Sequence, residues 1–388
     1  MANYLGNYDP DFLAAQMLIA LTNRLGLANT VFRGYDATAQ QLGSTIKVTG
    51  PAYFEASDVN PSSGGTTQDL NTRDLEIKLD KWKEVKYKLT DKELTYTKER
   101  IITDHIGPAA YAVADQIDKD IAAYIKMFPS VVNWSDPVVG TDITKARKAL
   151  FNQRCPMDPN NLFLMVDGDK EAALLSANLF ISNEGSGDAG VNAQINGMLG
   201  RRYGFNIFAN QNTPSMTSGT ATDLAGAVNN ANGVKKGAVE VAVDGLTASS
   251  TFKAGDLLAI TGDDQKYAIT EDVTLGASAT SATFKVYPPL AQDSADDAVV
   301  TITLAAGSGA TKSQCFAYHR NAMALAMAPL STMGAQLGDL VSTAIDPVTG
   351  LAIRSTIFSD ADHSQIKVKY DALYGIAPLD PALGCRIM

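Results

Sequence analysis

The chain has 388 residues, 45% of them hydrophobic and 19% charged, which is enough for two or three domains that each bury a core. Its formal net charge of −10 argues against sequence-specific DNA binding, because neutralising phosphates requires clustered lysine and arginine. Its three cysteines are far apart and none belongs to a C-x-x-C pair, so the sequence indicates neither a disulfide framework nor a zinc site.

The start of the chain lacks the basic region of a secretion signal, and no stretch approaches the roughly 18 apolar residues of a membrane span. We therefore expect the protein to be made in the cytosol, without a membrane partner. A cell-surface β-domain protein is an alternative class that would require such a signal.

The first hundred residues predict one helix followed by a long polar hairpin. Apolar residues recur at every fourth position from Leu13 to Leu25, as on one face of a helix. Alternating apolar residues then indicate three strands within residues 45–90, while residues 60–67 are turn-forming and offer nothing apolar to bury. The returning arm, residues 73–100, carries nine basic and seven acidic residues. Such a two-sided polar hairpin is not stable alone and needs a surface to lie on.

The longest predicted helix begins near Pro108 and ends before Pro129, with apolar residues spaced by three and four along one side. At about 20 residues it would be roughly 30 Å long, enough to span a domain. A mixed α/β layer follows, in which Asp167 caps the second helix. The expected elements of this layer are a helix, a strand, a helix and a strand at residues 142–153, 162–166, 170–177 and 204–209.

Residues 218–311 differ in composition from the sequence on either side, being rich in Ala, Thr, Ser, Gly and Val. Five basic against eleven acidic residues give this segment a net charge of −6. Short alternating strands separated by turn signals predict a small β-barrel or sandwich whose chain ends lie close together. Its expected core consists of Val239, Val241, Val243, Phe252, Leu257, Leu258, Ile260, Tyr267, Ile269, Phe284, Val286 and Ile302. Three strand-like segments follow before a proline-containing tail, at residues 315–330, 351–358 and 364–370.

Motifs for catalysis or cofactor binding are weak or absent in the sequence. The glycines from Gly185 to Gly190 match G-x-G-x-x-G, but no strand precedes them and Asn210 stands where an acidic residue is expected, so we interpret the segment as a loop. Neither a nucleophile elbow nor a P-loop is present, and the three histidines share no metal-ligand spacing. We therefore expect no catalytic residue, no cofactor and no metal.

Two groups of acidic residues could gather a hard cation, but neither has the spacing of an EF-hand. We interpret them as solvated turn residues. The groups are Asp263, Asp264, Glu271 and Asp272, and Asp293, Asp296 and Asp297.

The order of the predicted elements, together with two short segments, resembles the Hong Kong 97-type major capsid proteins of tailed bacteriophages. The segments are Ile-Asp-Lys-Asp-Ile-Ala at residues 117–122 and Ile-Lys-Val-Lys-Tyr-Asp-Ala-Leu-Tyr-Gly at residues 366–375, the latter followed by Pro378 and Gly384. The resemblance implies an α+β fold with an N-terminal arm, an extended loop, a spine helix, and peripheral and axial domains. The acidic segment is similar to the β-domain inserted in the short-tailed-phage branch of the family.

The resemblance divides the chain into seven parts. In chain order they are the N-terminal arm, the extended β-hairpin loop, the spine helix of the peripheral domain, the first part of the axial domain, the inserted β-domain, the second part of the axial domain and the return to the peripheral domain, at residues 1–44, 45–95, 96–130, 131–217, 218–311, 312–350 and 351–388. We expect the inserted domain to steady the axial domain and to contact neighbouring subunits on the outer surface of a shell.

The resemblance implies self-assembly of hexamers and pentamers into an icosahedral or prolate shell around double-stranded DNA, without enzymatic activity. It also implies scaffolding and portal proteins as partners, non-specific contact with packaged DNA, and a location in the virion and, during assembly, in the host cytoplasm. The nearest alternative is an encapsulin-like shell protein of a bacterial nanocompartment, which shares the fold. An α/β cofactor-binding enzyme is a more distant alternative, since it would need the Gly185 loop to bind a nucleotide.

The polar hairpin is the expected contact surface between subunits. Its lysines could instead form a nucleic-acid patch, but the interleaved acidic residues favour a solvated or subunit-facing surface. Modest contacts across a neighbouring subunit would recur many times in a closed shell. The candidate interface residues are Asn60, Pro61, Gly64, Gly65, Arg73, Lys78, Lys81, Trp82, Lys83, Lys86 and Lys88.

Overall fold

The computed structural model describes residues 10–34, 45–49, 56, 58–59, 74–90, 105–135, 140–177, 180, 193–333, 340–346, 350–360, 363 and 365–388. The chain forms two compact units, each assembled from segments that are far apart in sequence. The first unit consists of Met1–Leu25, Arg33–Asp115 and Met323–Leu379. The second consists of Gly26–Phe32, Gln116–Ala322 and Asp380–Met388.

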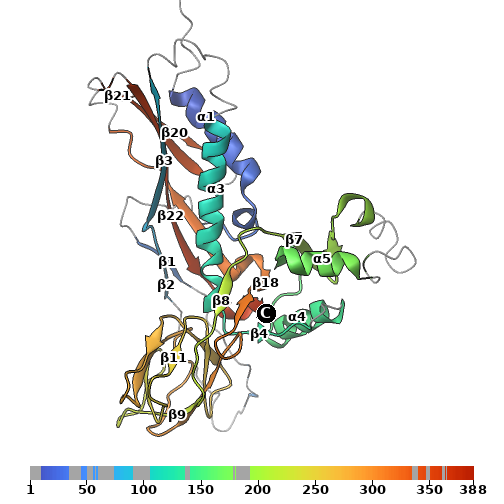
Figure 1. Ribbon diagram of the computed structural model, residues 1–388, viewed down its shortest axis with the longest axis vertical. Coiled ribbons are helices and arrows are strands. Elements are labelled where there is room, and N and C mark those ends of the chain that lie inside the picture. The colour runs from blue at the N-terminus through green and yellow to red at the C-terminus, as the bar shows by residue number, and fades with distance from the viewer. Residues whose placement is uncertain are drawn as a thin grey trace, which may run out of the picture. The chain divides into compact units, whose positions relative to one another are not determined.

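The first unit is built on a five-stranded antiparallel sheet (Figure 1). Its strands are β3 (Lys81–Thr90), β19 (Met323–Ala328), β20 (Leu340–Ile345), β21 (Ala352–Asp360) and β22 (Gln365–Pro378). β22 lies in the centre, because β3 pairs along one of its edges while β21 and then β19 pair along the other. The strands β1 (Thr45–Thr49) and β2 (Asp74–Lys78) form a separate antiparallel pair.

The returning arm of the predicted hairpin finds its support within its own chain. β3 pairs with β22 along its whole length, from Lys81 opposite Tyr374 to Thr90 opposite Gln365. The idea of an unsupported hairpin is therefore wrong for this strand, because β22 satisfies its backbone hydrogen bonds along one edge. The three strands predicted within residues 45–90 are present as β1, β2 and β3.

Helix α1 (Pro10–Arg24) packs on β20 and β21. The apolar stripe predicted from its four-residue spacing is buried at Leu13, Met17 and Leu21. On the same side, the hydroxyl of Ser342 donates a hydrogen bond to the carboxylate of Asp11. Residues opposite one another in the strand register share a face of the sheet. Ser342, Ser355 and Tyr370 follow one another across three strands in this way, and all three are buried on the face that α1 covers.

The second unit contains a mixed six-stranded sheet. In spatial order its strands are β4 (Val131–Val132), β23 (Gly384–Ile387), β18 (Cys315–His319), β5 (Leu162–Val166), β7 (Phe205–Ala209) and β6 (Arg201–Arg202). Helices α4 (Gly140–Asn152) and α5 (Gly168–Ser176) contribute Leu150 and Leu174 to the core against this sheet. α5 begins as predicted, since the Asp167 carboxylate accepts a hydrogen bond of 2.8 Å from the backbone N–H of Lys170.

The C-terminal region holds more strand than the sequence predicts. β22 continues to Pro378, and after a 3-10 turn at Pro381–Leu383 the strand β23 joins the sheet of the second unit. β23 is buried throughout, so it lacks the polar alternation that would have revealed it. The segment expected as one strand-like stretch at residues 315–330 is two strands in different sheets, separated by a 3-10 turn at Arg320–Ala322.

Residues 218–311 contain a closed barrel of six antiparallel strands, drawn in yellow to orange around β9 in Figure 1. In spatial order they are β9 (Ala225–Val228), β10 (Glu240–Asp244), β15 (Ala282–Tyr287), β13 (Lys266–Ile269), β12 (Leu257–Ile260) and β16 (Val299–Thr303). The predicted β-barrel is therefore confirmed, and its predicted core is buried except for Val239. Val239 is 52% exposed because it precedes the first residue of β10 and lies outside the pleat.

Two short strand pairs accompany the barrel. β8 (Ser215–Thr217) pairs with β17 (Thr311–Ser313), so the chain enters and leaves the barrel side by side. β11 (Thr251–Phe252) pairs with β14 (Val273–Thr274). The pairing of β8 with β17 agrees with the expectation that the two ends of this segment lie close together.

Helix α3 (Gly107–Ala122) contributes residues to both units and ends earlier than predicted. The backbone N–H of Tyr124 donates to the carbonyl of Ile121, three residues back rather than four, and a 3-10 turn follows at Ile125–Met127. Phe128, the last residue of the predicted stripe, is still buried. Of the helices in the described residues, none is long and apolar enough to cross a membrane.

Candidate functional site

One face of the five-stranded sheet carries charged and aromatic side chains; we call it the charged face. Along β3, Trp82, Glu84, Lys86 and Lys88 are exposed, whereas the residues between them are partly buried on the other side. The register places neighbours from β22 and β21 on the same face. The charged face is defined by Trp82, Glu84, Lys86, Lys88, Arg354, Phe358, Lys367, Lys369 and Asp371.

Asp371 is the centre of the charged face and is almost fully buried. Its oxygens accept two hydrogen bonds from the Arg354 guanidinium, at 3.0 and 2.6 Å, and one from the Trp82 indole N–H at 3.0 Å. Bonds between ionised groups in this two-pronged arrangement are stronger and more directional than neutral ones. A single buried carboxylate therefore joins β3, β21 and β22 on this face.

Lys369 extends the network from β22 to β3. Its ammonium lies 2.7 Å from a Glu84 oxygen and 3.2 Å from Asp371. Burial disfavours the charged form of Lys369, but the hydrogen bonds and charges of Glu84 and Asp371 outweigh this and raise its pKa. The lysine is therefore held as a cation between two carboxylates.

Trp82 is the exposed aromatic residue that this network holds in place. Its side chain remains 46% exposed although the indole N–H is bound to Asp371. The Lys369 ammonium lies 5.0 Å, and the Arg354 guanidinium 6.0 Å, from the centre of the ring. Cations at this range attract the ring face. A tryptophan fixed on both its edge and its face loses little side-chain freedom on contact with another molecule, which favours tight contacts.

The predicted interface residues fall into three groups. Trp82, Lys86 and Lys88 lie together on the charged face, where the Lys86 ammonium sits 4.7 Å from the centre of the Phe358 ring. Lys81 and Lys83 are partly buried on the opposite side of β3, and Lys78 is exposed at the end of β2. Asn60, Pro61, Gly64, Gly65 and Arg73 lie outside the described residues.

Sequence reasoning missed the residues that organise the charged face, namely Glu84, Arg354, Lys369 and Asp371. Their charges were visible, but the pairing of β3 with a strand some 280 residues further along the chain was not. Asp371 and Lys369 stand in a segment that alternates like a strand, which is the only sequence signal that places them on one face.

A second buried carboxylate organises the base of the barrel. Asp256 is fully buried, and it accepts hydrogen bonds from the backbone N–H groups of Gly219, Lys253 and Ala305 at 3.0, 2.9 and 3.2 Å. Gly219 stands just after the chain enters this segment, and Ala305 just before it leaves. Asp256 therefore ties both ends of the inserted segment to the loop between β11 and β12.

Asp118, in the segment that carries the capsid-protein resemblance, has a comparable role within the second unit. Its carboxylate accepts hydrogen bonds from the backbone N–H groups of Gly26, Leu27 and Ala28 at 2.9, 3.1 and 3.0 Å. Gly26 and Leu27 donate to one carboxylate oxygen and Ala28 to the other, which is possible because each oxygen can accept more than one hydrogen bond. This residue of α3 therefore fixes the turn that follows α1.

The cysteines and the acidic residues considered as possible metal ligands are buried thiols or partners of lysines. The thiols of Cys155, Cys315 and Cys385 are buried, and burial raises their pKa values to about 12, 12 and 11, so they stay protonated. Asp272 and Asp293 pair with Lys253 and Lys235. The described residues contain no group of three or more His, Cys, Asp or Glu side chains placed to hold a metal ion. The Gly185–Gly190 motif lies outside the described residues.

Residues 72–256 match a family model described as phage capsid protein. The matched stretch, just under half of the chain, is similar to phage capsid proteins. A comparison with curated protein sequences finds no match.

Solved structures are similar to this chain in fold. A chain from Mycobacterium phage Che8 aligns with a TM-score of 0.51 at 15% identity, covering 94% of this chain and 90% of that one. The capsid structure of cyanophage P-SCSP1u aligns with a TM-score of 0.48 at 10% identity, covering 90% of this chain and 84% of that one. A virus-like particle from Pyrococcus furiosus aligns with a TM-score of 0.45 at 8% identity, covering all of both chains. The alignment with the Che8 chain confirms the predicted Hong Kong 97-type fold.

Proposed function

We propose that this protein assembles with copies of itself, as hexamers and pentamers, into a closed icosahedral or prolate shell around double-stranded phage DNA. The observation that carries the proposal is the charged face, where Trp82 is half exposed yet held by Asp371, Lys369 and Arg354. A rigid aromatic residue surrounded by charged side chains has the composition of an interface centre with a polar rim. A second copy of the chain is the partner that a shell supplies.

Weak contacts between subunits are sufficient to hold a closed shell together, because each contact is repeated many times. Each charged pair at a solvent-exposed rim contributes only about 0–1 kcal/mol. In a closed shell every subunit makes the same contacts in a symmetric arrangement, so the small contributions recur around the whole surface. Lys86 and Lys88, exposed beside Trp82, supply the positive part of such a rim.

Contact with the genome is non-specific in this proposal. The net charge of −10 keeps the subunit from binding DNA tightly, so the shell holds its contents by closure and the DNA moves freely during packaging. Assembly takes place in the host cytoplasm with scaffolding and portal proteins. The protein has a structural role and no catalytic one.

A nanocompartment shell protein remains the rival with the same fold. Two features favour the phage capsid: the family model that matches residues 72–256, and the barrel inserted between β8 and β17. The two functions differ in cargo, since one shell encloses DNA and the other encloses enzymes.

Electron microscopy and light scattering of the purified full chain test the proposal. We expect capsomers or closed shells, formed by the chain alone or with a scaffolding protein from the same gene cluster. A species that stays monomeric at 41.1 kDa under both conditions contradicts it. Shells isolated from infected cells that contain protein cargo and no DNA would instead support the nanocompartment.

A further inference from the structure

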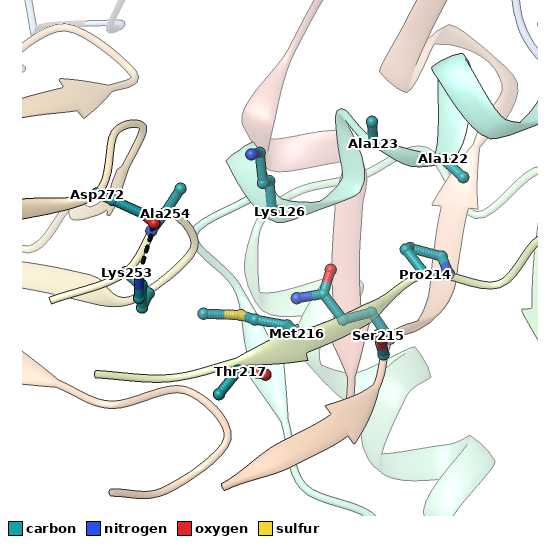
Figure 2. Close-up of a pocket in the computed structure, with 11 residues that line it drawn as sticks. Ala122, Ala123, Lys126, Pro214, Ser215, Met216, Thr217, Lys253, Ala254 and Asp272 are labelled. Atoms are coloured by element: carbon teal, nitrogen blue, oxygen red, sulfur yellow. Dashed lines mark hydrogen bonds and ion pairs between the residues drawn. The ribbon is translucent and has the colours of Figure 1, made fainter. Parts of the chain in front are cut away.

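A hollow of about 430 Å³ lies within the second unit, beside the base of the barrel. Figure 2 shows Lys126 from the turn after α3, Met216 from β8, and Lys253 and Asp272 from the loops next to β11 and β14. Gln314, in the chain that leaves the barrel, completes the polar part of the wall. Three elements that are distant in sequence therefore bring hydrogen-bonding groups to one place.

The charges around the hollow leave one cation without a counter-ion. Lys253 is 2.7 Å from Asp272, whose other oxygen accepts a hydrogen bond of 2.9 Å from the backbone N–H of Ala254. These hydrogen bonds, with the charges of Lys253 and Lys126, lower the pKa of Asp272, so it is ionised at neutral pH. Lys126 makes no ion pair with any described residue. The lining therefore has two ammonium groups and one carboxylate, a net charge of +1.

Gln314 provides an independent indication of a ligand. Its side chain is 1% exposed, and no acceptor among the described residues binds its Nε2 amide nitrogen. Its backbone N–H donates to the carbonyl of Pro214 at 2.8 Å, so the donor without an acceptor is the side-chain amide. A buried donor without an acceptor costs about 1–3 kcal/mol, a cost that an acceptor in the hollow removes.

A further positive charge stands behind the wall. Arg386 is fully buried, and its Nη1 lies 3.6 Å from the sulfur of Met216, a residue that lines the hollow. Its Nε and Nη2 have no partner among the described residues. Burial lowers the pKa of Arg386 to about 10, which still leaves it protonated at neutral pH. The nearby carboxylate of Asp256 is already bound by three backbone N–H groups.

We propose that this hollow binds a single carboxylate group, presented by an acidic side chain of another polypeptide. The oxygens accept from Lys126 and from the Gln314 amide, which are the two donors left open. Asp272 in the wall disfavours a doubly charged group such as phosphate, because like charges at short range repel. Pro214 and Ala122 form an apolar side that suits the hydrocarbon stem and flanking residues of such a side chain.

Fluorescence anisotropy of the full chain with labelled peptides tests the site. The probe is a short alanine peptide with one central glutamate, and its matched control carries glutamine instead. We expect weak binding, with a Kd of about 1 mM, and about tenfold weaker binding of the glutamine peptide, because charge-assisted hydrogen bonds are the stronger ones. Equal affinity for both peptides, or no binding of the glutamate peptide, overturns the proposal.

Variants locate the binding within the hollow. Lys126→Ala should weaken the glutamate peptide about tenfold, whereas Lys126→Arg should retain most of the affinity. Lys235→Ala is the control, because Lys235 pairs with Asp293 at 3.0 Å and does not line the hollow. Gln314→Leu should weaken binding while leaving thermal stability equal or higher, since it removes a donor that lacks an acceptor. An unchanged affinity in Lys126→Ala contradicts the site.

Competition separates the possible sources of the carboxylate. Acetate that displaces the peptide at the peptide's own concentration supports the carboxylate site but assigns it to small free anions. Acetate that displaces it only at a much higher concentration supports a side chain with its flanking residues. Inorganic phosphate that competes more strongly than both overturns the preference for a single charge. None of these outcomes depends on shell formation, so they leave the proposed function untouched.

Discussion

Arg354 and Asp371 lie directly opposite one another in β21 and β22, and two hydrogen bonds join their side chains. Nε of the arginine donates to Oδ1 at 3.0 Å, and Nη2 donates to Oδ2 at 2.6 Å. The arginine side chain is 17% exposed and the aspartate side chain fully buried, so water and salt screen this pair far less than a surface pair. The pair fixes the carboxylate that in turn holds Trp82 and Lys369.

Replacing Arg354 with methionine should destabilise the subunit by roughly 2–4 kcal/mol, because Asp371 would keep a buried charge with fewer donors. The double variant Arg354→Met with Asp371→Leu should recover most of that loss, since no unpaired charge remains. Urea unfolding of the unassembled subunit measures both. The control Lys47→Ala breaks an exposed pair with Glu76 at 4.0 Å and should cost less than about 0.5 kcal/mol. Equal stability of Arg354→Met and the control would show that the network does not hold the sheet.

Replacing Trp82 with alanine should lower the yield of assembled shells several-fold while leaving the subunit folded. The ring is half exposed, so the fold loses mainly one hydrogen bond to the Asp371 carboxylate, worth about 1.5–3 kcal/mol. Trp82→Phe should restore part of the yield, because it keeps a ring on the charged face. Val239→Ala, at a position 52% exposed on the barrel, is the control. Sedimentation gives the shell yield and circular dichroism the thermal midpoint; unchanged assembly in Trp82→Ala would remove this surface from the interface.

Replacing Asp256 with asparagine should loosen the base of the barrel. The asparagine amide turns an N–H₂ group toward backbone N–H donors that now bind an oxygen, which costs roughly 2–3 kcal/mol. We expect a lower thermal midpoint and faster proteolytic cleavage near Gly219 and Ala305. Asp264→Asn is the matched control, since that side chain is exposed on a turn. Identical cleavage of both variants would contradict the role of Asp256 in tying the two ends together.

His319 should make the subunit less stable in mild acid. Burial lowers its pKa from the ordinary value of 6.5, and the backbone N–H of Asn321 donates to its Nδ1 at 3.2 Å, which requires that nitrogen to be unprotonated. Below pH 6.5 the unfolded chain therefore binds more protons at this site than the folded one. The free energy of unfolding then decreases as the pH is lowered, until the pH passes below the pKa of His319 in the folded state. Well above pH 6.5 both states are neutral and this residue adds no pH dependence.

The comparison of His319→Gln with the natural chain measures this effect. Glutamine keeps an acceptor for Asn321 but does not titrate, so urea unfolding between pH 7 and pH 5 should show a weaker loss of stability. His363→Gln is the control, because His363 is exposed. A pH dependence that is the same in both variants would assign the acid sensitivity to other groups.

Local patterns in the sequence were sufficient to predict most elements. The four-residue spacing marked α1, the cap Asp167 marked the start of α5, and alternation marked the strands of the barrel. Each of these signals depends on neighbouring residues and on one buried face, which is the information that a short window contains.

The missed features all depend on distant pairing or on complete burial. β23 is buried throughout and shows no alternation, and Arg386 within it gave no hint that a guanidinium would stand in a core. The charged face required knowing that β3 lies beside β22, which spacing within either segment does not reveal. Helix α3 ends earlier than predicted because the backbone N–H of Tyr124 donates to the carbonyl of Ile121, three residues back. The spacing of apolar residues does not reveal this change in backbone hydrogen bonding.

The pairing of β8 with β17 makes the barrel an exchangeable module. Thr217 and Thr311 lie opposite one another, and their hydroxyls are 2.7 Å apart. Paired strands place such residues roughly 5 Å apart at their Cα atoms, a gap that a tight turn of a few residues closes. The same gap accepts any foreign domain whose own termini are adjacent. The chain can therefore gain, lose or replace a domain at this junction while the strand order of the six-stranded sheet stays the same.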